Sequence, residues 1–267
     1  MRLVYLGTPS MAVPPLESLV AAGHEVVLVV TGVDKRRGRG SDTSPSPVKA
    51  AAQRLGLPVS HDVDDVIDVG ADLGVVVAFG KIIKPHVLAA VPMVNLHFSL
   101  LPRWRGAAPV ERALLEGDSS TGVCVMAVEE GLDTGGVYAR VEVPIGESTT
   151  ADELRIELVE IGSRLLVDTL ERGLGVAEPQ VGVATYAAKI DPAELRIDWA
   201  KPAVEIHRLI RVGGAWTTFL GARFKIHAAT VVDGRLVPTV VQPEGKPRMA
   251  YDAWRNGARP ADDERFE

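Results

Sequence analysis

The stretch LVYLGTPSMAVPPLESLVAAGHEVVLVV, residues 3–30, decides the fold. It holds two short apolar runs, at residues 3–6 and 26–30, separated by a segment with helical periodicity at residues 12–22. Continuous apolar runs of this length are typical of parallel strands that are buried on both faces of a sheet. A strand, a helix and a second strand in this order predict a βαβ unit.

The same pattern continues along the chain. Residues 74–78 (GVVVA) and 94–98 (VNLHF) are further apolar runs, and residues 47–55 have helical periodicity. Each of the first two helical segments is followed by a glycine, Gly23 or Gly56, as many helices are. We therefore expect an α/β fold built on a predominantly parallel, doubly wound sheet.

Further elements follow, and then the composition changes. The sequence predicts helices at residues 108–116 and 150–172 and strands at residues 122–128 and 137–143. After the second of these helices, short strand and turn patterns replace the helical periodicity. This change indicates a second, smaller domain.

We expect the domain boundary close to residue 185. Residues 1–185 then form the α/β domain, residues 186–202 a linker and residues 203–267 a small β-rich domain. In the small domain, Asp233-Gly234 lies between two apolar runs. Because this pair is a favoured tight turn, it predicts a β-hairpin there.

Composition excludes several classes of protein. Of the 267 residues, 46% are hydrophobic and 24% charged, which is typical of a packed globular protein rather than a disordered or fibrous one. No segment approaches the roughly 20 apolar residues that a membrane span needs, and the first apolar run leaves no room for a signal peptide. The single cysteine, Cys124, cannot form an internal disulfide, and no cysteine or histidine cluster has metal-ligand spacing. We therefore expect a soluble, cytoplasmic protein with no membrane partner and no metal.

Charge is distributed unevenly along the chain. The whole sequence has 29 basic and 35 acidic residues, whereas residues 201–267 hold 11 basic and 8 acidic ones. A basic segment joined to an acidic body favours a polyanionic partner. A solvated basic surface explains the same asymmetry, and charge alone does not decide between the two.

Side chains that can carry chemistry lie in the run at residues 94–98 and directly after it. Asn95, His97 and Ser99 are spaced two apart, so in an extended strand they face one side. They lie at the carboxyl end of a strand, where open α/β sheets bind ligands. An asparagine amide can donate to a developing oxyanion, and an imidazole can accept or pass on a proton near neutral pH. This pair suits acyl transfer without a covalent enzyme intermediate.

Asp133 is a third candidate, in the acidic and glycine-bracketed segment EEGLDTG at residues 129–135. A carboxylate beside the imidazole would orient the ring and favour its protonated form. From the spacing of these residues alone, catalysis is only weakly supported, and a buried structural histidine with a solvated acidic turn explains the pattern as well or better. The chain lacks the dinucleotide, P-loop and G-x-S-x-G patterns at its strand ends, so nucleotide binding of those types and serine hydrolysis lose their usual support.

Longer motifs surround these candidates. They are NLHFSLLPRWRGAAP at residues 95–109, EGLDTG at 130–135, LGTP at 6–9, GRG at 38–40 with SPVK at 46–49, and KI at 189–190 with RIDW at 196–199. In these motifs the chain resembles the 10-formyltetrahydrofolate-dependent formyltransferases, and most closely the group of them that acts on methionyl-tRNA. The resemblance covers nearly the whole chain.

The resemblance implies a fold, a reaction and a catalytic trio. The fold is a Rossmann-like formyltransferase domain followed by a small β-barrel-like (OB-like) domain that helps to hold tRNA and is shortened in this chain. The reaction moves a formyl group from 10-formyltetrahydrofolate, a co-substrate, to the α-amino group of methionine on initiator tRNA, without a metal. The trio is Asn95, His97 and Asp133. We expect the protein to be a monomer.

The resemblance also implies binding residues. It assigns folate contacts to Phe79, Gly80, Ile82, Ser99, Leu100, Leu101, Pro102 and Glu130, and tRNA contacts to Arg36, Arg39 and Lys225.

Three alternatives share parts of this pattern. A formyltransferase acting on a nucleotide-linked amino sugar would use the same trio on another acceptor, and a formyltetrahydrofolate hydrolase would use water in place of the amine. A degenerate, non-catalytic binding protein would keep the fold and the basic segment. The motifs at residues 38–40, 46–49 and 103–109 favour the tRNA enzyme over the amino-sugar enzyme, and the intact trio argues against a degenerate protein.

Overall fold

The computed structural model describes residues 1–36, 43–261 and 264–267. Within them the chain divides into two compact units that interleave in sequence. The first unit comprises Met1–Pro109, Ser120–Pro144 and Arg155–Ala187, and the second comprises Val110–Ser119, Ile145–Leu154 and Ala188–Glu267. The domain limits expected from the sequence stay a prediction.

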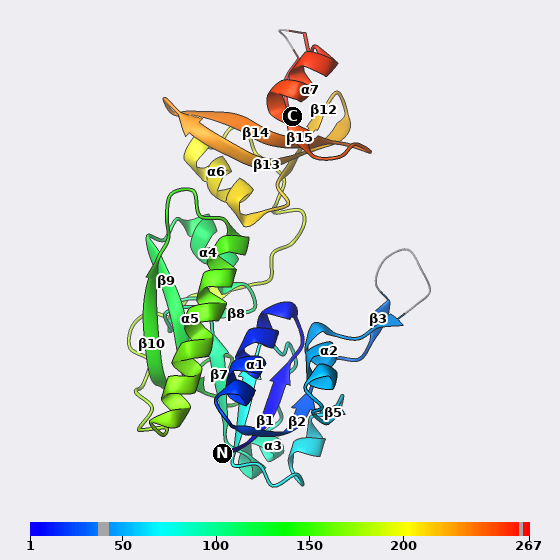
Figure 1. Ribbon diagram of the computed structural model, residues 1–267. Helices are drawn as coiled ribbons and strands as arrows, with labels where there is room; N and C mark the ends of the chain where they lie inside the picture. Colours follow the sequence, from blue (N-terminus) through cyan, green and yellow to red (C-terminus); the bar gives the residue numbers. More distant parts are fainter. Residues whose placement is uncertain (37–42, 262–263) are drawn as a thin grey trace. The chain divides into compact units, whose positions relative to one another are not determined.

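The first unit is built on a sheet whose seven strands, in the described residues, run in the order β10-β9-β7-β6-β1-β2-β5 (Figure 1). They are β1 (Arg2–Gly7), β2 (Glu25–Val30), β5 (Val59–Ser60), β6 (Leu73–Val77), β7 (Met93–His97), β9 (Ser120–Ala127) and β10 (Val137–Pro144). The pairs from β7 to β5 are parallel, whereas β9 is antiparallel to both of its neighbours. From β1 the chain winds outward through β2 to β5, then crosses to β6 on the other side of β1. The doubly wound α/β class is confirmed.

Helices pack on both faces of this sheet. They are α1 (Val13–Ala21), which follows the 3-10 turn η1 (Ser10–Ala12), α2 (Pro47–Arg54), α3 (Pro85–Ala90), which follows the 3-10 turn η2 (Asp64–Val66), and α5 (Ala151–Glu171). The start of α2 shows why such segments become helical. Pro47 occupies the first turn, and the Ser46 hydroxyl caps the helix by accepting from the Lys49 amide at 3.0 Å. Among the described residues, no helix is long and apolar enough to cross a membrane.

The two faces of β7 have different neighbours. Met93 packs in an apolar cluster with Val87 of α3, and Asn95 and His97 face the same side because strand residues alternate. Leu96 faces the opposite side, where α5 lies so close that a Cβ on Gly162 would be 3.3 Å from the Leu96 side chain. One face of β7 therefore packs on α5, and the other packs near α3 through Met93 and presents Asn95 and His97 further along the strand.

Two short strand pairs complete the first unit. β8 (Arg105–Gly106) pairs in parallel with β11 (Tyr186–Ala187), and β3 (Lys35–Arg36) pairs with β4 (Thr43–Ser44). The first of these pairs joins segments that are about 80 residues apart, so the end of the unit is tied back to the turn after β7.

The second unit contains an antiparallel sheet of four strands in the described residues, in the order β12-β13-β14-β15. The strands are β12 (Trp216–Phe219), β13 (Ala222–Val232), β14 (Arg235–Pro243) and β15 (Met249–Ala250), and the helices are α4 (Pro109–Glu116), α6 (Ala203–Val212) and α7 (Tyr251–Ala258). Ile206, Phe224 and Trp254 belong to its apolar core. The hairpin at Asp233 and Gly234 is confirmed, since both residues have positive φ between paired strands.

The edge strand β12 of the small sheet is covered by the last residues of the chain. Thr218 and Glu267 exchange two main-chain hydrogen bonds, of 3.0 and 3.2 Å, and the Thr217 hydroxyl donates to the Glu267 carbonyl at 2.7 Å. Phe266 stacks on Trp199 with ring centroids 5.4 Å apart. The C-terminal segment thereby pairs main-chain groups that would otherwise remain open at the sheet edge.

Two apolar side chains of α5 give a matched test of this packing. Leu158 is fully buried, whereas Ile156 is 70% exposed. Leu158→Ala should lower the free energy of unfolding by about 2–5 kcal/mol because it leaves a cavity, and Ile156→Ala should change it by less than about 0.5 kcal/mol. Urea titration followed by circular dichroism measures both variants. Equal losses would contradict the orientation of α5.

Candidate functional site

Three neighbouring strands of the first unit end at one edge of the sheet. Gly7 of β1 lies opposite Val77 of β6, and Val76 of β6 lies opposite Asn95 of β7. The turns that follow β6 and β7 therefore leave the sheet close to each other. The winding direction reverses between β1 and β6, and the carboxyl ends of strands at such a reversal are where α/β proteins bind ligands.

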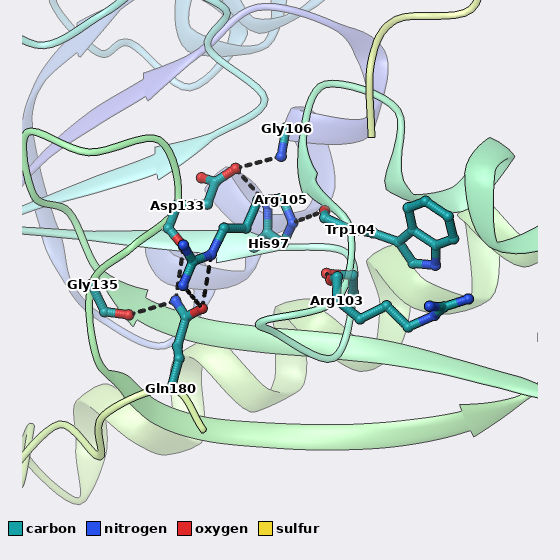
Figure 2. Close-up of polar contacts among 9 residues, drawn as sticks. His97, Arg103, Trp104, Arg105, Gly106, Asp133, Gly135 and Gln180 are labelled. Carbon is teal, nitrogen blue, oxygen red and sulfur yellow. Dashed lines mark hydrogen bonds and ion pairs between the residues drawn. The ribbon is translucent and has the colours of Figure 1, made fainter. Parts of the chain in front are cut away.

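His97 is the last residue of β7, and its side chain is 6% exposed. Its Nε2 lies 2.8 Å from the carbonyl oxygen of Trp104 (Figure 2). A carbonyl only accepts hydrogen bonds, so Nε2 carries a proton and donates it to this contact. Nδ1 is the remaining polar atom of the ring, and it lies 3.7 Å from Oδ2 of Asp133.

Asp133 lies in the loop between β9 and β10, with a φ of 51°. Its Oδ2 accepts a hydrogen bond of 2.8 Å from the main-chain N–H of Gly106, and its side chain is 16% exposed. Figure 2 shows the carboxylate between Gly106 and the ring of His97. The separation of 3.7 Å exceeds a hydrogen bond, as catalytic contacts often do before substrate binds. The carboxylate is thus held on the Nδ1 side of the ring.

Asn95 completes the candidate trio. It is half-buried on β7, two residues before His97 and on the same face of the strand. An amide donor and an imidazole thus face one side of the sheet, and a carboxylate stands beside the imidazole. This arrangement can stabilise a developing oxyanion and move a proton.

The turn after β7 contains residues with positive φ, and it positions the groups that bind His97 and Asp133. The buried Ser99 hydroxyl donates to the carbonyl of Arg103 at 2.5 Å, and Trp104 follows with a φ of 63°. Gly106 has a φ of 119°, and a Cβ there would lie 2.9 Å from the Ala187 carbonyl oxygen. Only glycine fits this close approach, which brings the Gly106 N–H to Asp133. The sequence predicts that Asn95, His97 and Ser99 face one side of a strand. In the structure the strand ends at His97, and Ser99 lies in the turn that follows it.

The residues expected to contact folate differ in accessibility. Phe79, Ser99 and Leu101 are buried, Leu100 and Pro102 are half-buried, Gly80 turns with a φ of 74°, and Ile82 and Glu130 are exposed. Leu101 packs with Cys124 and Met126. A ligand can reach Ile82 and Glu130 directly, whereas the buried members shape the two turns. Their role in folate binding stays a prediction.

Of the residues expected to contact tRNA, Arg36 and Lys225 lie on different strands. Arg39 is outside the described residues, the backbone of Arg36 ends β3, and Lys225 lies on β13 opposite Trp216 and Gln242. Their role stays a prediction.

Neither a metal site nor a reactive thiol is found in the described part of the chain. No set of three or more His, Cys, Asp or Glu residues there is arranged to hold a metal ion. The Cys124 thiol lies within β9, and burial raises its pKa, so the reactive thiolate is disfavoured.

Several groups at the site were missed by sequence reasoning. The carbonyl of Trp104 and the N–H of Gly106 are main-chain groups, and no side-chain pattern reports where a main-chain group points. Gln180 and Thr185 lie in a stretch without strong periodicity, and both contact the loops of the site. The Gly-Ala-Ala sequence after Arg105 was the only available signal, since a glycine in a turn often marks a close backbone approach.

Comparison with known proteins gives matches over most of the chain. A family model described as formyl transferase matches residues 1–170, and one described as formyl transferase, C-terminal domain, matches residues 189–236. A methionyl-tRNA formyltransferase from Dinoroseobacter shibae is 48% identical over 251 residues, which cover 88% of this chain and 84% of that protein.

Solved structures share the fold. A methionyl-tRNA formyltransferase from Clostridium thermocellum superposes with a TM-score of 0.65 at 16% identity, covering 91% of this chain and 98% of that one. An N-formyltransferase from Helicobacter canadensis, solved with folinic acid and dTDP-3-aminofucose, gives a TM-score of 0.66 at 18% identity over 93% of this chain and 98% of that one. At these identities the likeness carries the fold, and the sequence matches carry the family. The chain belongs to the formyltransferase family and, within it, to the methionyl-tRNA formyltransferases.

Proposed function

We propose that this protein transfers the formyl group of 10-formyltetrahydrofolate to the α-amino group of methionine on initiator tRNA, for translation initiation. The observation that carries the chemistry is the contact between His97 and Asp133 at the end of β7. The acceptor rests on methionyl-tRNA formyltransferases that match this chain over most of their own length.

The reaction breaks one C–N bond and forms another. The uncharged amine attacks the formyl carbon, N10 of the folate leaves, and the amine gives up one proton while N10 gains one. Negative charge develops on the formyl oxygen during the attack, so hydrogen-bond donors aimed at that oxygen lower the barrier.

The trio divides these tasks. The Asn95 amide and the protonated ring of His97 donate to the oxyanion. Because Nε2 of His97 is bound to the Trp104 carbonyl, Nδ1 is the ring atom that serves the reaction. Asp133, on the Nδ1 side, stabilises the imidazolium and assists removal of the amine proton, directly or through a water molecule.

The proposal also includes the residues that contact folate and tRNA. The turn at residues 79–82, the turn at residues 99–102 and the exposed Glu130 hold the folate, and the basic residues Arg36, Arg39 and Lys225 contact tRNA phosphates. The protein acts as a cytoplasmic monomer.

An amino-sugar acceptor is supported by fold alone. The Helicobacter canadensis structure shares the fold at 18% identity, and that level of likeness does not transfer an acceptor. A dTDP-linked amino sugar is therefore tested as a competing acceptor in the formylation assay.

Single-turnover formylation of methionine-charged initiator tRNA with 10-formyltetrahydrofolate tests the acceptor. We expect formylmethionyl-tRNA from the intact protein and no product with uncharged initiator tRNA, which lacks the amine. A dTDP-linked amino sugar is offered in parallel. Formylation of the sugar with none of the methionyl-tRNA would contradict the proposal, as would release of free formate without transfer.

Substitution of the trio tests the assigned roles. Asn95→Ala removes one oxyanion donor and should lower the single-turnover rate on the order of 10²–10³-fold. Asp133→Asn removes the charge beside His97 and should also lower the rate strongly. Asn256→Ala and Asp68→Asn are matched controls, because both side chains are exposed. Circular dichroism and thermal unfolding check the fold, and full activity in either trio variant would remove that residue from the site.

A further inference from the structure

The segment QVGVATYA, residues 180–187, runs beside both loops of the site. It follows the last helix of the first unit and ends in β11. Val181 and Val183 within it are 86% and 87% exposed, so their side chains contribute little packing. Two of its polar residues, Gln180 and Thr185, instead bind the segments that surround His97.

Gln180 spans the gap between the Asp133 loop and the turn after β7. Its Nε2 donates to the carbonyls of Asp133 and Gly135, both at 2.8 Å. Its Oε1 accepts from Nη2 and Nε of Arg105, at 2.7 and 3.1 Å. Figure 2 shows the side chain between these groups. Both N–H groups of the amide and its oxygen are therefore used, which fixes its orientation.

Thr185 holds the other partner of His97. Its hydroxyl accepts from the main-chain N–H of Trp104 at 2.9 Å, and its carbonyl accepts from the N–H of Arg105 at 2.9 Å. These bonds lie on either side of the Trp104 carbonyl, which accepts from His97. Pairing of β8 with β11 continues the contact to Gly106, whose N–H binds Asp133.

We propose that Gln180 and Thr185 are positioning residues for the formyl transfer. Gln180 sets the position of Asp133 on the Nδ1 side of His97, and Thr185 sets the carbonyl that binds Nε2. Neither touches the reacting atoms. The inference rests on the catalytic roles proposed for His97 and Asp133.

The backbone conformations explain why such support is needed. Asp133 and Trp104 have φ values of 51° and 63°, in the left-handed region that side-chain-bearing residues rarely adopt. Such conformations persist only where surrounding contacts enforce them. Without the two donors of Gln180, the loop is free to relax and the carboxylate leaves its place beside the ring.

Substitutions of Gln180 separate its two sets of contacts. Gln180→Ala removes all four hydrogen bonds, whereas Gln180→Glu keeps an acceptor for Arg105 but loses both donors to the Asp133 loop. Both should lower the single-turnover rate at saturating substrates on the order of 10- to 100-fold, with the KM for methionyl-tRNA unchanged. Val181→Ala, in the neighbouring exposed residue, should keep the full rate.

A double-mutant comparison shows whether Gln180 acts through Asp133. In an Asp133→Asn background, Gln180→Ala should have little further effect, because the group that it positions has lost its function. An equal loss of rate in both backgrounds would overturn the inference. A Gln180→Ala variant with a lower Tm but a normal rate per folded molecule would also overturn it, because Gln180 would then only stabilise the fold. If Asp133→Asn itself keeps full activity, the proposed catalytic trio fails, and the inference fails with it.

Thr185 allows a conservative rescue. Thr185→Val has nearly the same shape but leaves the Trp104 N–H without its acceptor, and Thr185→Ser keeps the hydroxyl. The valine variant should lose single-turnover rate and the serine variant should regain it. Equal rates in the two variants would overturn the assignment of Thr185.

Discussion

The hydrogen bond from Nε2 of His97 to the carbonyl of Trp104 determines how the whole site is used. It fixes the buried ring in one orientation, and the proton of Nε2 is used in this bond. Only Nδ1 is left to face Asp133 and, in the proposed reaction, the formyl group. The strand that carries His97, the turn that carries Trp104 and the loop that carries Asp133 must all be held in register for this bond to have its effect.

The sheet and the segment at residues 180–187 together hold this strand, this turn and this loop in register. Parallel pairing places the ends of β6 and β7 at one edge, and α5 anchors the opposite face of β7 through Leu96. The sheet alone cannot fix the loops that leave it. Trp104 and Asp133 both have positive φ, and the segment at residues 180–187 binds the chain at both places. That segment lies between the two ranges that the family models match, so its contacts become visible only in the structure.

Sequence reasoning recovered the parts of the molecule that depend on local pattern. The apolar runs predicted the central strands, because burial on both faces of a sheet requires apolar residues. Asp233-Gly234 predicted the hairpin, because left-handed turn geometry favours these residue types. The candidate trio was predicted from residue chemistry and motif resemblance, and its catalytic role stays a prediction. Short elements such as α3 and β12 were missed, since six or four residues carry too little periodicity to stand out. The Trp104 carbonyl and Gln180 were missed because their roles depend on contacts between distant segments, which no local pattern encodes.

The central claim is that Nε2 of His97 bears a proton bound to the Trp104 carbonyl while Nδ1 faces the reaction. Nitrogen-15 NMR of the histidine-labelled protein tests it most directly, with His97→Gln used to identify the signal. The account predicts that the proton of the neutral His97 ring is on Nε2. A neutral ring protonated at Nδ1, with Nε2 bare, would contradict it, because the lone pair of Nε2 would then face a carbonyl oxygen at 2.8 Å.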